Sequence, residues 1–510
     1  MATARDTVLV LGSDVEGLAA AATLARSGKK VVLIERAERA GGIHAEREFH
    51  PGFRAGGLLH DAGLVRAALL APLELERHGL AWRKRPVQIV VPSEDGRAFT
   101  LSRAPRELTG LPDESQAFER WSAFVARLEP LVQGLFDAPP PEISAPSPLE
   151  LFDLARRALS LRGHGARFVQ DLLRIAPSSA FDWLGECFTD PALQAALAAP
   201  ALLGTCFGPR APATSALVIL QHAARGSEPE GGLAALARAL EAAARAAGVE
   251  FRLGRAPRRI LLDSSGVQGV ELEDGERILA PALLSALDPK TTLLELLPAS
   301  TLPPSLENAA RSFRTRGAVA SLALALSRAP EWAFATPDGQ AVERVLTARS
   351  LLELERASDP WKYGEIPERP WLDLSLSHAS PPAPQGAATL SVLVQGVPSA
   401  PKGGWNEAER EQLLAGIFAA LERVAPGIRS SVLAHELLVP TDIERRFGLS
   451  GGHVFAGEIA LDQLLITRPS LAFARYRTKI PGLFLGSAGS HPGGPFAGGA
   501  GILAARAIRG

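Results

Sequence analysis

The feature that most constrains this chain lies near its start, where a short apolar run, a glycine turn and an alanine-rich segment follow one another. Thr7–Leu11 favours a buried strand, and Leu18–Arg26 favours a helix that ends before Gly28. Val31–Ile34 favours a second buried strand. A strand, a helix and a strand within about 30 residues form a βαβ unit, whose two strands pair in parallel. The opening of the chain therefore predicts an α/β fold built on a parallel sheet.

The turn between the first strand and the helix has the spacing of a dinucleotide-binding loop. It reads GSDVEG over residues 12–17, and Glu35 follows at the end of the second strand. In such loops the glycines permit a tight turn and a close approach of the diphosphate, the helix N-terminus supplies N–H donors, and the acid binds a ribose hydroxyl. Strand, turn, helix, strand and acid in this order predict a Rossmann-like nucleotide-binding domain rather than a generic turn.

Asp14 occupies the position of the middle glycine in this loop. A carboxylate about 5 Å from one phosphate charge, at an effective dielectric constant of about 20, weakens binding by roughly 3 kcal/mol, or about a hundredfold. A carboxylate at a helix N-terminus also accepts unpaired N–H groups and suits the helix dipole. Asp14 therefore either opposes a bound diphosphate or supplies internally the anion that a cofactor would otherwise provide.

The rest of the chain predicts two insertions between pieces of the nucleotide-binding domain. The first is mostly helical and contains a proline-rich stretch, and the second carries apolar runs typical of strands. The expected pieces of the nucleotide-binding domain are residues 1–60, 226–296 and 439–510, and the expected substrate regions are residues 61–225 and 297–438. Further expected elements are helices at 149–159, 190–203, 232–247 and 406–424, strands at 249–253, 283–286, 318–326 and 389–394, and a hairpin turning at 274–275.

Two polar regions near the end of the chain are candidates for contact with a substrate. His491 lies in a glycine-rich turn between a strand and the last helix, where we favour a structural role over contact with substrate or flavin. It is the one weak candidate for a catalytic residue. In the second region we favour a salt-bridged turn over a substrate-facing surface. That region contains Arg445, Arg446, His453, Glu458, Asp462 and Arg468.

Composition excludes several classes of function. The chain has 54 basic and 55 acidic side chains, so it lacks the positive charge expected of a nucleic-acid-binding protein. Cys187 and Cys206 are far apart and suggest neither a disulfide framework nor a metal site, which fits a reducing, cytoplasmic setting. No apolar run reaches about 18 residues, so no membrane span is expected. Motifs of metalloproteases, P-loop enzymes and α/β-hydrolases are absent from the sequence.

Several short motifs in a fixed order give the chain a family resemblance. They are Gly41-Gly42 with Pro51-Gly52-Phe53, Pro229–Leu233, Ser285–Lys290, Phe447–Gly452, Ala460–Leu464, Tyr476–Thr478 and the HPGG turn at 491–494. With these motifs, nearly the whole chain resembles the phytoene-desaturase-like flavoproteins, in particular the branch called pyridine nucleotide-disulfide oxidoreductase domain-containing protein 2.

The resemblance implies an FAD-dependent oxidoreductase in which an α+β substrate domain is inserted into the nucleotide-binding domain. It implies oxidation, saturation or isomerisation of a lipophilic or conjugated small molecule, and a peripheral contact with membranes is compatible with the inserted regions. NAD(P) is an alternative occupant of the first loop, although the HPGG turn matches the flavin group better. The expected cofactor-binding residues are Gly12, Ser13, Asp14, Gly17, Glu35, Arg36, Gly41, Gly42, Pro257, Gly486, Ser487, Pro492, Gly493 and Gly494.

Three positions depart from the family pattern, and all lie near the expected cofactor. Asp14 replaces a glycine, Glu46 replaces a threonine, and Gly486-Ser487 replaces a cysteine-glycine pair. Two of these changes add a carboxylate. The competing hypothesis is therefore a flavin-free relative that acts as a cofactor-independent catalyst, a carrier or a partner-binding subunit. The sequence indicates neither the substrate nor the oligomeric state.

Overall fold

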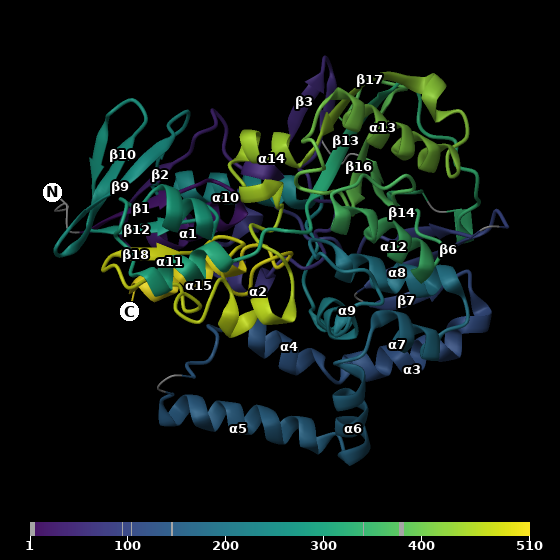
Figure 1. Ribbon diagram of the computed structural model, residues 1–510, viewed down its shortest axis with the longest axis horizontal. Helices are drawn as coiled ribbons and strands as arrows, with labels where there is room; N and C mark the ends of the chain where they lie inside the picture. The colour runs from purple at the N-terminus through teal and green to yellow at the C-terminus, as the bar shows by residue number, and fades with distance from the viewer. Residues whose placement is uncertain are drawn as a thin grey trace.

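A five-stranded parallel sheet forms the nucleotide-binding half of the computed structural model, as the opening βαβ unit predicts (Figure 1). The structure describes residues 6–93, 95–103, 105–143, 146–339, 341–376 and 382–509. The sheet has the order β18-β12-β1-β2-β8. Its strands are β1 (Thr7–Leu11), β2 (Lys30–Ile34), β8 (Glu250–Arg252), β12 (Ala282–Ser285) and β18 (Leu483–Leu485). Strands from three distant parts of the chain therefore meet in one sheet.

Three helices pack beside one another against this sheet. They are α1 (Val15–Arg26), α10 (Gly232–Ala246) and α15 (Gly499–Arg509). The alanines at positions 19–22 of α1 are fully buried, and their small side chains let the neighbouring helices approach. At Gly501 the approach of α15 is so close that a Cβ atom would overlap the carbonyl oxygen of Glu16. The alanine-rich and glycine-rich segments of the sequence thus become a tight three-helix contact.

A small antiparallel sheet extends from the nucleotide-binding half. Its strands are β9 (Pro257–Asp263), β10 (Gly266–Leu272) and β11 (Arg277–Leu279). The chain turns between β10 and β11 at Asp274-Gly275, as the sequence predicts, and Gly275 has a φ angle of +87°. The separate pair β3 (Arg47–His50) and β4 (Phe53–Ala55) forms a two-stranded sheet.

The second large sheet has eight strands in the order β17-β13-β16-β15-β14-β5-β6-β7. Its neighbours are antiparallel except for the parallel pair of β14 and β5. Its strands are β5 (Ile89–Pro92), β6 (Ala98–Arg103), β7 (Arg106–Thr109), β13 (Val319–Leu326), β14 (Arg344–Leu346), β15 (Leu372–Leu376), β16 (Ala388–Gln395) and β17 (Val432–Leu438). The sequence correctly predicts β13 and β16, whose apolar runs are buried.

Residues 61–225 contribute three strands, β5, β6 and β7, to the eight-stranded sheet. This region is mostly helical, as predicted, but its three strands complete the sheet that the second insertion begins. Its main helices are α2 (Ala67–Leu70), α3 (Ser115–Ala126), α4 (Glu129–Phe136), α5 (Pro148–Gly163), α6 (Ala166–Ile175), α7 (Ala180–Cys187), α8 (Pro191–Leu202) and α9 (Thr214–Ala223). Figure 1 shows α5 and α6 at the outer edge of this helical layer. The two insertions thus share one mixed sheet.

The remaining helices are α11 (Pro304–Ser312), α12 (Leu351–Ser358), α13 (Glu407–Glu422) and α14 (Pro440–Phe447). Helix α13 matches the predicted helix at 406–424, and Asn406 caps its N-terminus by accepting a hydrogen bond from the N–H of Ala408. Among the described residues, no helix combines the length and the apolar character needed to cross a membrane.

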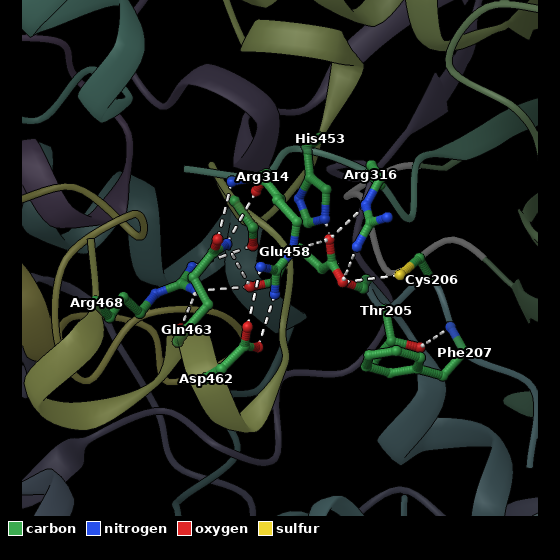
Figure 2. Close-up of polar contacts among 12 residues, drawn as sticks. Thr205, Cys206, Phe207, Arg314, Arg316, His453, Glu458, Asp462, Gln463 and Arg468 are labelled. Atoms are coloured by element: carbon green, nitrogen blue, oxygen red, sulfur yellow. Dashed lines mark hydrogen bonds and ion pairs between the residues drawn. The ribbon is translucent and has the colours of Figure 1, made fainter. Parts of the chain in front are cut away.

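A buried carboxylate ties distant segments together next to the large sheet (Figure 2). Glu458 is fully buried, and its Oε2 accepts hydrogen bonds from Nε of Arg314 at 3.1 Å and Nε of Arg316 at 3.0 Å. The Sγ atom of Cys206 donates to Oε1 at 2.8 Å. Burial, together with the neighbouring Glu458, raises the pKa of the Cys206 thiol to about 12, so the thiol keeps its proton. The region predicted to be a salt-bridged turn is therefore held by ion pairs.

Arg468 fixes the same region from its other side. Its fully buried guanidinium donates hydrogen bonds only to main-chain carbonyl oxygens among the contacts of the described residues. They belong to Phe455, Gly457, Glu458, Gln463 and Ala488. Burial lowers the pKa of Arg468 to about 9. Because Arg468 binds the carbonyl oxygens of Phe455 and Glu458 directly, it fixes the segment at 455–458 in place.

We expect Glu458→Ala to lower the free energy of unfolding by about 3 kcal/mol, because two guanidinium groups lose a buried hydrogen-bonded partner. Asp462→Ala is the matched control, since Asp462 also pairs with Arg314 but its side chain is 70% exposed. An exposed pair contributes less than about 1 kcal/mol. Chemical denaturation of both variants measures the difference, and equal losses would show that the buried network does not stabilise the loop.

Candidate functional site

A cavity of about 900 Å³ lies at the carboxyl ends of β1, β2 and β12. Gly12 follows β1, Glu35 follows β2, and Leu287 and Asp288 follow β12, and all of them line the cavity. Ligands of open parallel sheets bind at this edge, and cavities for small ligands commonly measure about 300–1,000 Å³. The position and the size of the cavity therefore fit a dinucleotide.

The glycines of the first turn bring the backbone close to this cavity. Gly12 has a φ angle of +91°, which favours glycine, and a Cβ atom at Gly17 would overlap the carbonyl oxygen of Gly12. A Cβ atom at Gly42 would lie 3.1 Å from the Cβ atom of Asp14. The turn thus excludes a side chain at Gly17 by direct overlap, and at Gly12 and Gly42 it combines positive φ angles with tight contacts.

Asp14 is the N-cap of α1. Its Oδ1 accepts a hydrogen bond of 2.9 Å from the N–H of Gly17. Burial raises the pKa of this half-buried carboxyl to about 6, although the N–H of Gly17 lowers it. The carboxylate therefore folds back onto its own helix, as one of the two sequence interpretations predicts. The cavity beside it is nevertheless open, so capping by Asp14 has not closed the nucleotide site.

Glu35 joins the two ends of the βαβ unit. Its Oε2 accepts hydrogen bonds from the N–H of Ser13 at 2.9 Å and the hydroxyl of Ser13 at 2.7 Å, and its Oε1 accepts one from the N–H of Ala37 at 2.8 Å. Both lone pairs of Oε2 are used, whereas Oε1 has one further lone pair. Glu35 is thus fixed at the cavity wall and retains the capacity to accept a ribose hydroxyl.

Glu16 is a site residue that the sequence interpretation missed. It lines the cavity, and its buried carboxyl accepts hydrogen bonds from the N–H groups of Gly498 at 2.8 Å and Gly501 at 2.7 Å, at the start of α15. Burial raises the pKa of Glu16 to about 8. An acidic residue on the buried side of an alanine-rich helix is the signal that could have identified it.

Glu46 lines the same cavity but does not add an uncompensated charge to it. Its carboxylate forms an ion pair with Arg238 on α10. Asp14 and Glu46 are the two carboxylates that depart from the family pattern. Glu46 has a cationic partner, whereas the described contacts give none for Asp14.

The structure divides the expected cofactor-binding residues into two groups. Those that line the cavity are Gly12, Ser13, Asp14, Glu35, Arg36, Gly42, Pro257 and Gly494. Those outside its described lining are Gly17, Gly41, Gly486, Ser487, Pro492 and Gly493.

The second group supports the cavity from behind. The N–H of Gly486 donates to the carbonyl oxygen of Ser285 at 2.8 Å, which continues the pairing of β18 with β12. The N–H of Gly41 donates to the carbonyl oxygen of Ser13 at 2.8 Å. Gly493 packs against the guanidinium of Arg468, where a Cβ atom would overlap Nε. The expected cofactor-binding residues therefore include some that line the cavity and others that pack behind its wall.

His491 does not occur among the described residues that line the cavity. It is fully buried, and its Nε2 lies 3.0 Å from the carbonyl oxygen of Leu135 and 3.1 Å from that of Ala138. Burial lowers the pKa of His491 to about 4, so the neutral ring donates its Nε2 proton to these oxygens. These contacts at the end of α4 agree with the structural role that the sequence analysis favours for His491, and its contact with substrate or flavin stays a weak prediction.

Two motifs that are far apart in sequence meet at the cavity wall. The Oδ1 atom of Asp288 accepts a hydrogen bond of 2.9 Å from the hydroxyl of Ser450, and both residues line the cavity. Arg446 also lines it and forms an ion pair of 2.8 Å with Glu436. Asp288 and Ser450 belong to motifs of the family resemblance, and Arg446 belongs to the region predicted to form ion pairs. The sequence did not identify any of the three as cavity residues.

A second, smaller chamber adjoins the cavity between the helical layer and the eight-stranded sheet. The two spaces share Leu59, Asp61, Phe455 and Pro495. The chamber walls are mainly apolar, and α8, α9 and β14 contribute part of them. Among the described residues, no group of three or more His, Cys, Asp or Glu side chains could hold a metal ion.

Comparison with known proteins agrees with this geometry. Residues 17–509 match the family described as flavin containing amine oxidoreductase. The chain is 31% identical to pyridine nucleotide-disulfide oxidoreductase domain-containing protein 2 of Mus musculus, over 98% of this chain and 92% of that protein. It is 26% identical to hydroxyneurosporene desaturase of Rubrivivax gelatinosus, over 98% of this chain and 93% of that protein.

Solved structures share the fold at lower sequence identity. An oxidoreductase from Methanosarcina mazei superposes with a TM-score of 0.59 at 17% identity, over 99% of both chains. Putrescine oxidase bound to putrescine superposes with a TM-score of 0.58 at 14% identity, over 99% of this chain and 98% of that one. The match over almost the full length shows that the chain belongs to the flavin-containing amine oxidoreductase family and is a flavin oxidoreductase.

Proposed function

We propose that the 900 Å³ cavity binds FAD and that the protein moves a hydride between the flavin and a lipophilic or conjugated small molecule. One observation carries the proposal: the cavity at the ends of the parallel strands is open although Asp14 caps α1 beside it. A cavity of this size bounded by a glycine turn and a helix N-terminus fits a diphosphate.

The lining residues divide the cavity into expected subsites. The turn at Gly12, Ser13 and Gly42 would hold the diphosphate, and Glu35 would accept a ribose hydroxyl. Gly494 lies on the wall that would face the flavin ring. A bound flavin supplies the hydride chemistry, and the protein supplies position and electrostatics.

The apolar chamber supports a lipophilic substrate. Its walls include Phe136, Leu217, Leu220 and Phe496, and it shares four wall residues with the cavity. Relatives with full-length matches include enzymes named hydroxyneurosporene desaturase, and partial matches include enzymes named phytoene desaturase. The cytoplasmic setting and a peripheral membrane contact stay predictions from the sequence.

A competing candidate is a flavin-free protein that acts as a cofactor-independent catalyst, a carrier or a partner-binding subunit. It is favoured by one feature of the turn, since Asp14 and Glu35 already accept hydrogen bonds from the N–H groups of Gly17 and Ser13. NAD(P) is the other possible nucleotide. Thermal-shift titrations with FAD, NAD and NADP separate these cases, because only a bound nucleotide raises the melting temperature.

We expect Asp14→Gly to bind FAD about ten- to a hundredfold more tightly than the wild type at pH 8, because an ionised carboxylate near the diphosphate is removed. The loss of the helix cap to glycine costs only a few tenths of a kcal/mol. Glu46→Thr is the matched control and should change the affinity less than about threefold, because Arg238 already compensates that carboxylate. Fluorescence titration of FAD measures all three proteins. If Asp14→Gly bound FAD with unchanged affinity, the charge of Asp14 would have no effect on binding.

The affinity for FAD should also depend on pH. The pKa of Asp14 is raised to about 6, so the carboxyl is neutral below this pH and repels phosphate above it. Raising the pH from 5 to 7 should therefore weaken binding by about tenfold, and Asp14→Asn should remove most of this dependence. Glu16, with a pKa raised to about 8, should add a second decrease at higher pH in both proteins. Affinity that rises with pH in the wild type would contradict this assignment.

A further inference from the structure

The apolar chamber beside the cavity contains a buried group of paired charges. Arg344 on β14 donates hydrogen bonds to both carboxylate oxygens of Asp373 on β15, at 2.8 and 2.6 Å. Arg103 on β6 binds both oxygens of Asp61 in the same way, at 3.0 and 2.5 Å. Asp61, Arg344 and Asp373 all line the chamber. Charged side chains in an apolar wall are expensive to bury and therefore point to a role in recognition.

The two ion pairs of this group balance each other in charge, and burial raises the pKa of the neighbouring Glu228. Burial raises the pKa of Asp61, but Arg103 and Arg344 outweigh it and hold the pKa well below its usual range. Burial also raises the pKa of Asp373, and Arg344 with His60 brings it below its usual value. Both carboxyls are therefore ionised and face two guanidinium groups. A ligand that brings a net charge of its own would disturb this balance.

Asp61 and Arg344 are close without being directly bonded. The Nη1 atom of Arg344 lies 3.7 Å from Oδ2 of Asp61, which is longer than a hydrogen bond. A hydroxyl group donates one hydrogen bond and accepts others. It can donate to Asp61 and accept from Arg344 at the same time. A carboxylate only accepts, so it has no proton to donate to Asp61 and adds a negative charge to a group whose two ion pairs already balance. A hydrocarbon makes neither bond.

The position and the size of the chamber suit the end of a long molecule. Asp61 and Leu59 line both the chamber and the larger cavity, so the chamber lies directly beside the proposed flavin site. The free space of the chamber is about 40 Å³, enough for a small group. The longer, apolar part of such a ligand would lie toward the proposed flavin site.

We infer that Asp61 and Arg344 select a lipophilic substrate that ends in a hydroxyl group, over the matching hydrocarbon and the matching carboxylic acid. This inference rests on the proposed function, because it takes the chamber as part of the substrate site. The two residues bind the end of the substrate and hold it in register, and they transfer no proton.

The test measures the binding of three probes of equal chain length by quenching of tryptophan fluorescence. The probes are all-trans-retinol, all-trans-retinoic acid and deoxyretinol, the matching hydrocarbon. We expect the wild-type protein to bind retinol at least about tenfold more tightly than either other probe. Equal binding of retinol and deoxyretinol, tightest binding of the acid, or no quenching by any probe would overturn the inference.

Asp61→Asn locates the selection. The amide keeps the shape of the side chain but removes one negative charge, so the preference for retinol over retinoic acid should fall by about tenfold or more. Glu343→Gln is the matched control. Glu343 pairs with Arg83 outside the described lining of the chamber, and the same change from carboxylate to amide should leave the preference intact. An equal effect of both variants would contradict the inference.

Circular dichroism shows whether Asp61→Asn folds. If it does not fold, the order in which the wild-type protein binds the three probes still tests the inference. The outcome is also separable from flavin binding. A protein that binds FAD but shows no preference for retinol retains the proposed function and loses this inference. A protein that prefers retinol but binds no FAD retains the chamber assignment and loses the redox proposal.

Discussion

The close contact between β1 and the start of α1 is the constraint on which the rest of the site depends. A side chain at Gly17 would overlap the carbonyl oxygen of Gly12, so the backbone of the turn can pack only as glycine. This packing sets the N-terminus of α1 at the ends of the parallel strands, where Glu35 from the neighbouring strand reaches Ser13. The position of the cavity, the helix dipole beside it and the placement of Glu35 in its wall all follow from this contact.

Acidic residues near the cavity are balanced from within the protein. The N-terminus of α1 stabilises Asp14, the N-terminus of α15 stabilises Glu16, and Arg238 pairs with Glu46. In the adjoining chamber, Arg103 pairs with Asp61. The cavity therefore carries less uncompensated negative charge than its acidic residues suggest. A diphosphate would meet correspondingly less repulsion there. The pKa values of Asp14 and Glu16 are raised to about 6 and about 8, so the pH determines how strongly their carboxylates repel a phosphate.

Local patterns predicted much of the fold, and contacts between distant segments explain what they missed. The βαβ unit, α10 and α13 were predictable because apolar periodicity, glycine and caps act within a few residues. Strands β5 to β7 were not, since they are short and gain their stability from β14, far along the chain. The same holds for the site. Gly12 and Glu35 follow from the motif, whereas Glu16 and Asp61 become site residues only when α15 and β14 are placed beside them.

The most direct measurement is a crystal structure of the protein grown with excess FAD at pH 6. The proposal predicts a diphosphate at the N-terminus of α1, within hydrogen-bond distance of main-chain N–H groups in the turn at residues 12–17, and a ribose hydroxyl beside Glu35. A cavity without nucleotide at saturating FAD, with Asp14 still bonded to Gly17, would contradict it and leave only the architecture in place.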